Sequence, residues 1–248
     1  MTAPAPLARR AAAEAVGTAV LVAVVIGSGI QATNLTSDVG LQLLANCLAT
    51  VFGLAVLIAL FGPVSGAHFN PAVTLAAWLN GRRDQGGPDL REVGVYALAQ
   101  TSGAIGGAVL ANAMFAKPLV SWSTHHRSAG HLWLAEAVAT AGLVLLIFGL
   151  GRTGRDRLAP LAVAAWIGAA YWFTSSTSFA NPAVTLGRMF SDTFAGIAPS
   201  SAPAFIAAQL LGAAIGLGLL AVVFGRFRPA EPAPLVAQDE RELAPSGR

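Results

Sequence analysis

Apolar residues gather into six long blocks along the chain, and short polar or charged stretches separate these blocks. A helix needs about 20 mostly apolar residues to cross a bilayer, and each block is close to that length. Backbone groups inside lipid must satisfy their own hydrogen bonds, so we predict that the blocks are helices. The predicted spans are residues 11–30, 40–61, 93–115, 131–150, 158–176 and 203–225.

The composition supports an all-α polytopic membrane protein. Of the 248 residues, 55% are hydrophobic and only 11% are charged, whereas a soluble domain carries about 25% charged residues. The first block lacks a small-residue cleavage site after a short apolar core, so we expect a span there and not a signal peptide. We predict an N-terminal segment at 1–10, one membrane domain at 11–226, and a disordered tail at 227–248 that is rich in Pro, Ala and charge.

The basic residues predict the orientation of the chain in the membrane. With six spans, both termini share one side, and that side collects twelve of the 15 Lys and Arg residues. The opposite side holds Lys117, Arg127 and Arg188. Because basic loops stay in the cytoplasm, we expect both termini there and the protein in the inner (plasma) membrane. The net charge of +3 does not indicate nucleic-acid binding, since no basic face with interleaved aromatics is present.

The chain contains an internal repeat, and its clearest element is the string "NPAVTL", which begins at Asn70 and again at Asn181. Two further pairs of segments are similar: 13–29 with 135–151, and 96–107 with 205–216. The repeats cover about 11–115 and 131–226, and each holds three spans. Three is an odd number, so the second copy enters the membrane from the opposite side. Inverted repeats of this kind place a transport path near the midplane between the halves.

Each copy of the tripeptide Asn-Pro-Ala (NPA) predicts the start of a short helix. Asn is a good N-cap, and Pro is favoured at the first helical position. About 10 residues follow each motif, which gives roughly 15 Å of helix, or half a bilayer. Two such half-helices from opposite faces would meet at their N-termini, next to a watery cavity. The motif residues are Asn70, Pro71, Ala72, Asn181, Pro182 and Ala183.

Two NPA motifs on an inverted six-span repeat resemble the aquaporin (major intrinsic protein) family. The overall pattern is similar to a bacterial, aquaglyceroporin-like branch associated with arsenic resistance. The resemblance implies the aquaporin-like fold, a homotetramer with one pore in each protomer, and no cofactor. It also implies a passive channel for small neutral solutes: arsenous acid or related metalloid hydroxides, glycerol-like polyols and water.

The resemblance assigns roles to particular residues of this chain. Asn70 and Asn181 would donate hydrogen bonds to the passing solute. Glu14 and Glu136 are the acids predicted inside spans, where an uncompensated carboxylate costs a few kcal/mol. The family's matching residues bond the backbone of the NPA loops, so these two acids would brace the loops, together with His68.

The outer constriction departs from the family pattern. Most aquaporins follow the second NPA with Arg, but Val184 stands there in this chain. We locate the family's other filter positions by counting back along the chain from Val184 without gaps. This places them at Ser178, Ala169 and Thr50, with Phe52 as the alternative to Thr50. A filter of Thr, Ala, Ser and Val has no ring and no fixed charge, so we expect a wider constriction than in a water-selective aquaporin.

Three other functions stay open at this point. An ion-coupled secondary transporter would share the topology and would use Glu14 or Glu136 as a proton relay. A water-selective aquaporin and a non-conducting adhesion protein are the remaining alternatives. An enzyme is not expected, because no catalytic triad, phosphate loop or acid/base pair is present. The single Cys47 excludes an internal disulfide, and no metal site is expected.

Overall fold

The computed structural model describes residues 5–84 and 87–225, and this part of the chain forms helices and loops without any strand. The all-α fold class is therefore confirmed. The tail at 227–248 lies outside the described residues, and helix α1 already begins within the predicted N-terminal segment. The helices are α1 (Leu7–Leu35), α2 (Val39–Ser65), α3 (Pro71–Asp84), α4 (Leu90–Met114), α5 (Gly130–Arg152), the 3₁₀ turn η1 (Asp156–Leu158), α6 (Ala159–Phe173), α7 (Pro182–Arg188) and α8 (Ala202–Phe224).

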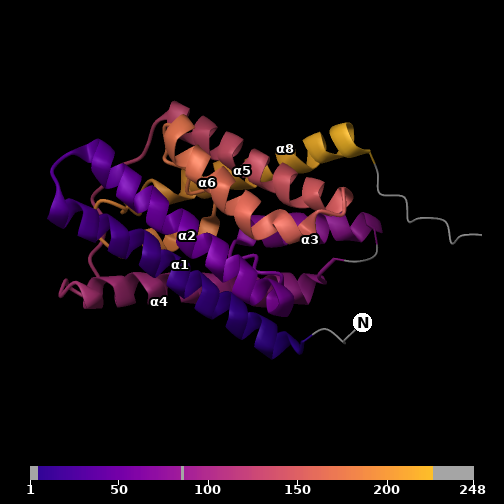
Figure 1. The fold of residues 1–248 in the computed structure, drawn as a ribbon, viewed down its shortest axis with the longest axis horizontal. Helices are drawn as coiled ribbons and strands as arrows, with labels where there is room; N and C mark the ends of the chain where they lie inside the picture. The colour runs from indigo at the N-terminus through magenta and orange to yellow at the C-terminus, as the bar shows by residue number, and fades with distance from the viewer. Residues whose placement is uncertain (1–4, 85–86, 226–248) are drawn as a thin grey trace, which may run out of the picture.

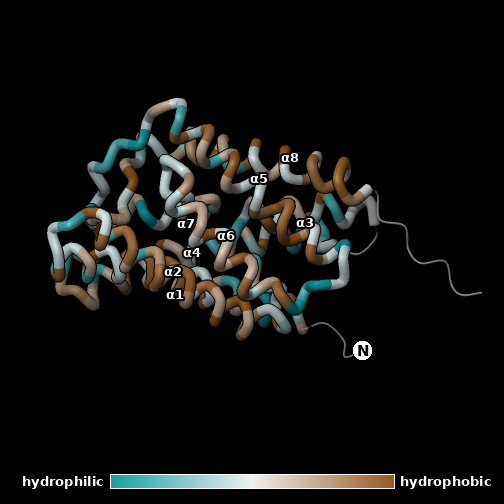
Figure 2. The backbone as a smooth tube through the Cα atoms, turned by 45° about the horizontal axis from the view of Figure 1, so that its top comes forward, coloured by the Kyte–Doolittle hydropathy of each residue, from teal (hydrophilic) through white to brown (hydrophobic). Residues whose placement is uncertain are grey.

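Five helices of the described chain are long and apolar enough to cross a membrane: α1, α2, α4, α5 and α8. Figure 2 shows their apolar middle sections and the more polar loops between them. The fifth predicted span, 158–176, is shorter than expected, because α6 has 15 residues. After Phe173 the chain leaves the helix and continues as a loop toward the second NPA motif.

The helices pair as an inverted repeat requires. The two most extensive contacts between helices join α1 to α4 in the first half and α5 to α8 in the second. Contact between α2 and α6 joins the halves. Helix α1 begins, and helix α8 ends, at the same end of the molecule (Figure 1).

The two half-helices start at the NPA motifs but differ in length. Helix α3 has 14 residues and α7 has 7, so the expectation of about 10 residues for each was wrong in both directions. In the second half, backbone N–H groups of Met189 and Phe190 donate to Leu186 O and Gly187 O, which ends α7 in a tight turn. Helix α7 is therefore only about two turns long, and a loop continues from it toward α8.

Glycines set the distance between the helices of each main pair. A Cβ atom at Gly103 or Gly107 would lie 2.2 or 2.1 Å from a carbonyl oxygen of α1. The same arrangement recurs in the second half, where Gly212 and Gly216 face carbonyl oxygens of α5 at 2.4 and 2.5 Å. Small residues at four-residue spacing let helix backbones approach closely in membranes. These glycines thus allow the close packing of both helix pairs.

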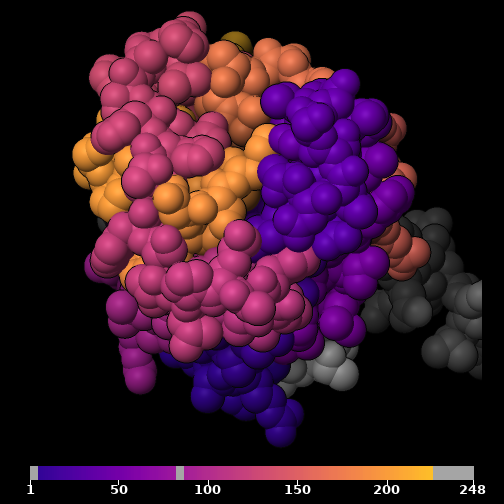
Figure 3. All heavy atoms as spheres, turned by 90° about the vertical axis from the view of Figure 1, so that its left-hand side faces the viewer, coloured from indigo at the N-terminus to yellow at the C-terminus, as the bar shows by residue number. Residues whose placement is uncertain are grey.

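Loops cover the end of the molecule opposite the start of α1 and the end of α8. Figure 3 views this end, where the loop at 115–129 lies beside the loop that follows α7. Backbone hydrogen bonds join them: Ser121 N–H to Phe190 O at 3.1 Å, Ser123 N–H to Met189 O at 2.9 Å, and Ala198 N–H to His125 O at 2.8 Å. We call this end the outer end.

The glycine contacts lead to a first prediction. Gly107→Val places a side chain against Ala19 O, where the Cβ alone would lie at 2.1 Å, so α1 and α4 must separate at a cost of about 1–3 kcal/mol. Thermal unfolding in detergent should occur at a lower temperature than in the parent. Gly106→Val is the matched control, since nothing lies within 4 Å of a Cβ there. Equal stability of the two variants would contradict the packing role.

Candidate functional site

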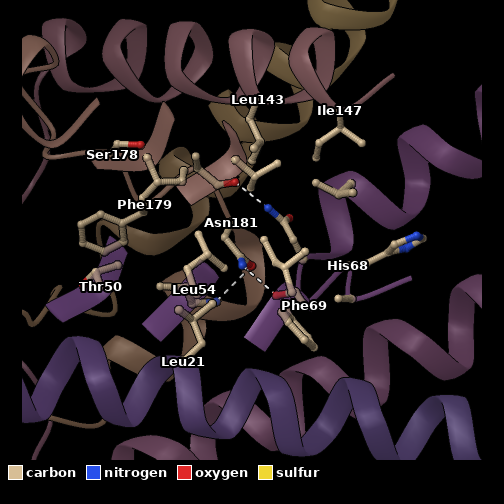
Figure 4. A pocket seen from close by; sticks show the side chains of 18 of the residues that line it. Leu21, Thr50, Leu54, His68, Phe69, Leu143, Ile147, Ser178, Phe179 and Asn181 are labelled. Carbon is tan, nitrogen blue, oxygen red and sulfur yellow. Dashed lines mark hydrogen bonds between the residues drawn. The ribbon is translucent and has the colours of Figure 1, made fainter. Parts of the chain in front are cut away.

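The two NPA loops meet in the middle of the molecule and are joined by a pair of reciprocal hydrogen bonds. The side-chain amide of Asn70 donates to Ala180 O at 2.7 Å, and that of Asn181 donates to Phe69 O at 2.8 Å (Figure 4). Each bond starts on one half of the repeat and ends on the backbone of the other. The two NPA motifs are therefore brought together at one point, as the inverted repeat predicts.

The amide oxygens of the same two residues cap the half-helices. Asn70 Oδ1 accepts from Ala72 N–H at 2.9 Å, and Asn181 Oδ1 accepts from Ala183 N–H at 2.9 Å and Val184 N–H at 3.2 Å. A side-chain amide carries two N–H donors. One N–H of each asparagine holds the opposite loop, and within the described residues no acceptor bonds the second N–H of either.

The loops before the motifs have an unusual backbone. Gly66 ends α2 with φ 86°, which is a common way to terminate a helix. Ala67 and Phe69 then adopt φ 49° and 48°, and Ser178 and Ala180 adopt φ 50° and 47° in the second loop. This left-handed region costs a residue with a Cβ about 1 kcal/mol or more. Other interactions must therefore hold both loops in place.

Glu14 supplies these interactions in the first half. Its carboxylate accepts from the backbone N–H groups of His68 at 3.0 Å and Phe69 at 2.6 Å. It also accepts from the Ser65 hydroxyl at 2.6 Å and from Gln100 Nε2 at 2.7 Å. Glu14 is fully buried, and four donors compensate its desolvation.

Glu136 does the same in the second half. Its oxygens accept from the N–H groups of Phe179 at 2.9 Å and Ala180 at 2.8 Å, and from Gln209 Nε2 at 2.6 Å. Gln209 Nε2 also donates to Thr185 Oγ1 at 2.9 Å, just as Gln100 Nε2 donates to Thr74 Oγ1 at 3.0 Å. The two glutamines and two threonines occupy matching places in the repeats, which is the signal that would have assigned them this role.

His68 lies beside the first loop. Its Nδ1 is 3.0 Å from Thr74 Oγ1, and its ring meets the Tyr96 ring edge-on with centroids 5.6 Å apart. His68 also lines the cavity described next. These contacts link the histidine to α3 and α4 as well as to its own loop.

A cavity of about 160 Å³ lies next to the paired loops, and both asparagines form part of its wall. This is room for on the order of ten water molecules. Figure 4 shows Thr50 and Ser178 on one side of it, His68 on the other, and Asn181 between them. Apolar side chains from α1, α2, α5 and α6 form most of the wall. An apolar wall with few polar groups suits small, uncharged solutes.

Three of the predicted filter residues line the cavity: Thr50, Ser178 and Val184. Thr50 Oγ1 donates to Asn46 O at 2.8 Å and lies 3.1 Å from the Tyr171 hydroxyl. Phe52, the alternative to Thr50, is 66% exposed on the outside of the protein and does not line the cavity.

The placement of Ala169 in the filter is wrong. Ala169 is exposed and shares the outer face of α6 with Leu161 and Trp172. The residues of α6 that line the cavity are Ala159, Val163, Ile167 and Tyr171, at the four-residue spacing of one helix face. Counting without gaps along the chain missed this face by two residues.

The cavity wall also contains rings and a charge that the predicted filter lacks, among them Tyr171, Phe179 and Arg188. From the sequence, Arg188 was placed on the side opposite the termini and was assigned no role, yet it is 4% exposed and ends α7. It lies one helical turn after Val184, on the same face, and this i, i+4 relation is the signal that would have identified it.

Arg127 approaches the same region from the outer loop. Its guanidinium lies 5.1 Å from the centroid of the Phe179 ring, and Arg127 Nε donates to Gly196 O at 3.1 Å. Burial lowers the pKa of Arg127, and the negative charge of Glu136 opposes this shift. An arginine remains a cation at neutral pH. Arg127 is not among the residues that line the cavity.

The geometry agrees with comparisons to known proteins. A family model described as major intrinsic protein matches residues 2–179. The chain belongs to the major intrinsic protein family. This is a family of channels and not of enzymes, as predicted.

Named relatives within the major intrinsic protein family cover nearly the whole chain. The chain is 47% identical to the aquaglyceroporin AqpS of Rhizobium meliloti (strain 1021) over 96% of its own length and 98% of that protein. It is 30% identical to the glycerol uptake facilitator protein of Pseudomonas aeruginosa, with 94% of each chain covered. The X-ray structure of the aquaglyceroporin from Plasmodium falciparum has the same fold, with a TM-score of 0.66 at 22% identity over 88% of this chain and 97% of that one.

The carboxylate contacts lead to a second prediction. Glu14→Ala leaves four donors without this acceptor, three of them in buried hydrogen bonds. Each lost charge-assisted bond costs about 1.5–3 kcal/mol. Its yield of folded protein in detergent should fall sharply. Glu14→Gln keeps one acceptor oxygen and should fall between Glu14→Ala and the parent.

Glu92→Ala is the control for this series. Glu92 pairs with Arg10 near the surface, where an ion pair contributes about 1 kcal/mol or less. Its removal should have a small effect. If Glu14→Ala were as stable as Glu92→Ala, the carboxylate would not hold the loop.

Proposed function

We propose that this protein is a passive membrane channel for glycerol-like polyols and other small neutral solutes, including arsenous acid or related metalloid hydroxides, and for water. The single observation that carries the proposal is the cavity that contains both NPA asparagines, each fixed by a bond to the opposite loop. The names of the relatives, an aquaglyceroporin and a glycerol uptake facilitator, favour polyols among the solutes.

The asparagines would guide the solute through hydrogen bonds. Each keeps one side-chain N–H that no protein acceptor takes, and a hydroxyl oxygen is a suitable partner for it. The rest of the wall is largely apolar and would contact the carbon skeleton of a polyol. A neutral solute with oxygens along one side fits such a surface better than an ion does.

The ends of the half-helices would exclude cations. A helix N-terminus carries about half a positive charge. A cation roughly 4 Å from one such end is repelled by about 2 kcal/mol at an effective dielectric near 20, so two ends give about 4 kcal/mol. Neutral solutes escape this penalty. The two N-termini lie together here because the asparagine bonds join the loops.

The alternatives are not favoured. An ion-coupled transporter would need Glu14 or Glu136 to exchange protons with the path, but both are fully buried, saturated by donors, and absent from the cavity wall. A water-selective pore agrees less well with the relatives' names. A non-conducting scaffold would have no use for paired asparagine amides at a cavity.

The protein would sit in the inner (plasma) membrane with both termini in the cytoplasm. The basic residues are concentrated on the side of the termini, which supports this orientation. Large apolar side chains such as Leu98, Leu161 and Val222 are more than two-thirds exposed on the single chain. Lipid and neighbouring copies in a homotetramer would cover these faces.

A passive channel predicts a specific transport behaviour. In proteoliposomes, glycerol flux should rise almost linearly with the glycerol gradient and should not respond to a proton gradient. Stopped-flow light scattering with and without a pH step measures both. Sustained accumulation of glycerol against its gradient would rule out the passive channel and favour an ion-coupled transporter.

Val184 provides a prediction about the breadth of the filter. Val184→Arg would add a long side chain to the face of α7 that lines the cavity, and wider solutes would lose room first. Glycerol and arsenous acid permeability should fall much more than water permeability. The variant must elute as a folded, monodisperse species for the comparison to count. A folded variant with the parent's ratio of glycerol to water permeability would place the filter elsewhere.

A further inference from the structure

The outer part of the cavity contains a buried guanidinium. Arg188 is 4% exposed, and its Nε donates to the carbonyl of Ala195. Its guanidinium carbon lies 3.4 Å from the centroid of the Phe179 ring. A buried cation is unfavourable unless other groups compensate it, and a stacked aromatic ring provides part of that compensation.

No carboxylate neutralises this charge within the cavity. Over the described residues, the ion pair found is that of Arg10 with Glu92, and none involves Arg188. The described residues that line the cavity include no Asp or Glu, and Arg188 is the only permanently charged side chain among them. Its positive charge therefore acts on whatever occupies the cavity.

Polar groups accompany the guanidinium at the same end. Tyr171 and Thr50 line the wall with their hydroxyl oxygens 3.1 Å apart. Ser178 also lines the wall, is 3% exposed, and has a buried hydroxyl without a hydrogen-bond partner in the described chain. A buried hydroxyl without a partner is unfavourable, and a ligand with a hydroxyl group would satisfy it.

We propose that Arg188 is the specificity-determining cation of the outer constriction, set one helical turn beyond Val184, and that with Ser178 it binds small neutral solutes with oxygens on adjacent atoms. The fork of guanidinium N–H groups matches two neighbouring oxygens, which a single ammonium cannot match in the same way. The fixed charge also repels hydronium and other cations. This inference rests on the proposed channel function and names the group that selects the solute.

Two substitutions of Arg188 test its positive charge and its paired N–H donors separately. Arg188→Gln removes the charge, so proton leak into proteoliposomes that contain a pH-sensitive dye should rise on the order of tenfold. Arg188→Lys keeps the charge and similar length but loses the fork. Its proton leak should stay within about twofold of the parent, while its ratio of glycerol to water permeability should fall several-fold.

Arg127→Gln is the matched control. Arg127 carries the same charge and contacts the same Phe179 ring, but it does not line the cavity. Its loss should leave both the proton leak and the permeability ratio close to those of the parent.

The outcomes decide each part of the inference. A parent-like leak in Arg188→Gln, or an equal rise in Arg127→Gln, overturns the role of Arg188 as the selecting cation. An unchanged permeability ratio in Arg188→Lys overturns the role of the fork. If Arg188→Gln fails to fold, Arg188→Lys and Arg127→Gln still test the fork and the position. A parent protein that passes no glycerol would instead overturn the proposed function itself.

Discussion

Two hydrogen bonds between asparagine amides and carbonyls of the opposite loop determine the centre of this protein. Asn70 bonds the loop of the second half and Asn181 bonds that of the first, so neither half can complete the site alone. The bonds bring together the positive ends of two short helices, which would otherwise repel each other. Buried carboxylates behind the loops oppose this repulsion and hold the strained backbone. The cavity, its asparagine donors and its barrier to cations all depend on that arrangement.

Negative and positive groups lie on opposite sides of the two NPA loops. The carboxylates of Glu14 and Glu136 lie on the side away from the cavity, while the helix N-termini and Arg188 act on the cavity itself. Hydrogen bonds from backbone and glutamine groups saturate the negative charges, so these do not attract cations into the path. The protein thus contains the anions that stabilise its loops without offering an anionic site to the solute.

The sequence predicted the features that both halves share better than those that occur in one half. Two NPA motifs in an inverted repeat indicated the fold and the meeting of the half-helices, because both halves carry the same residues at matching places. The family resemblance implied the bracing role of the glutamates. Ala169 was misplaced because its assignment depended on counting without gaps, whereas the helical phase of α6 turns Tyr171 toward the cavity. Arg188 was missed because the family pattern directs attention to the position directly after the second NPA, whereas the charge here lies one helical turn later, at the buried end of α7.

The bonds that join the halves end on backbone atoms, and this has a consequence for divergence of the sequence. The acceptors are the carbonyls of Phe69 and Ala180, a large aromatic residue in one half and a small one in the other. Glu14 and Glu136 likewise bond backbone N–H groups of the loops. Substitutions at these loop positions can therefore accumulate without removing a single bond of the central junction, provided that the backbone keeps its path. Because Phe69 and Ala180 also line the cavity, a change of either side chain would alter the wall that the solute meets and leave both bonds of the junction in place.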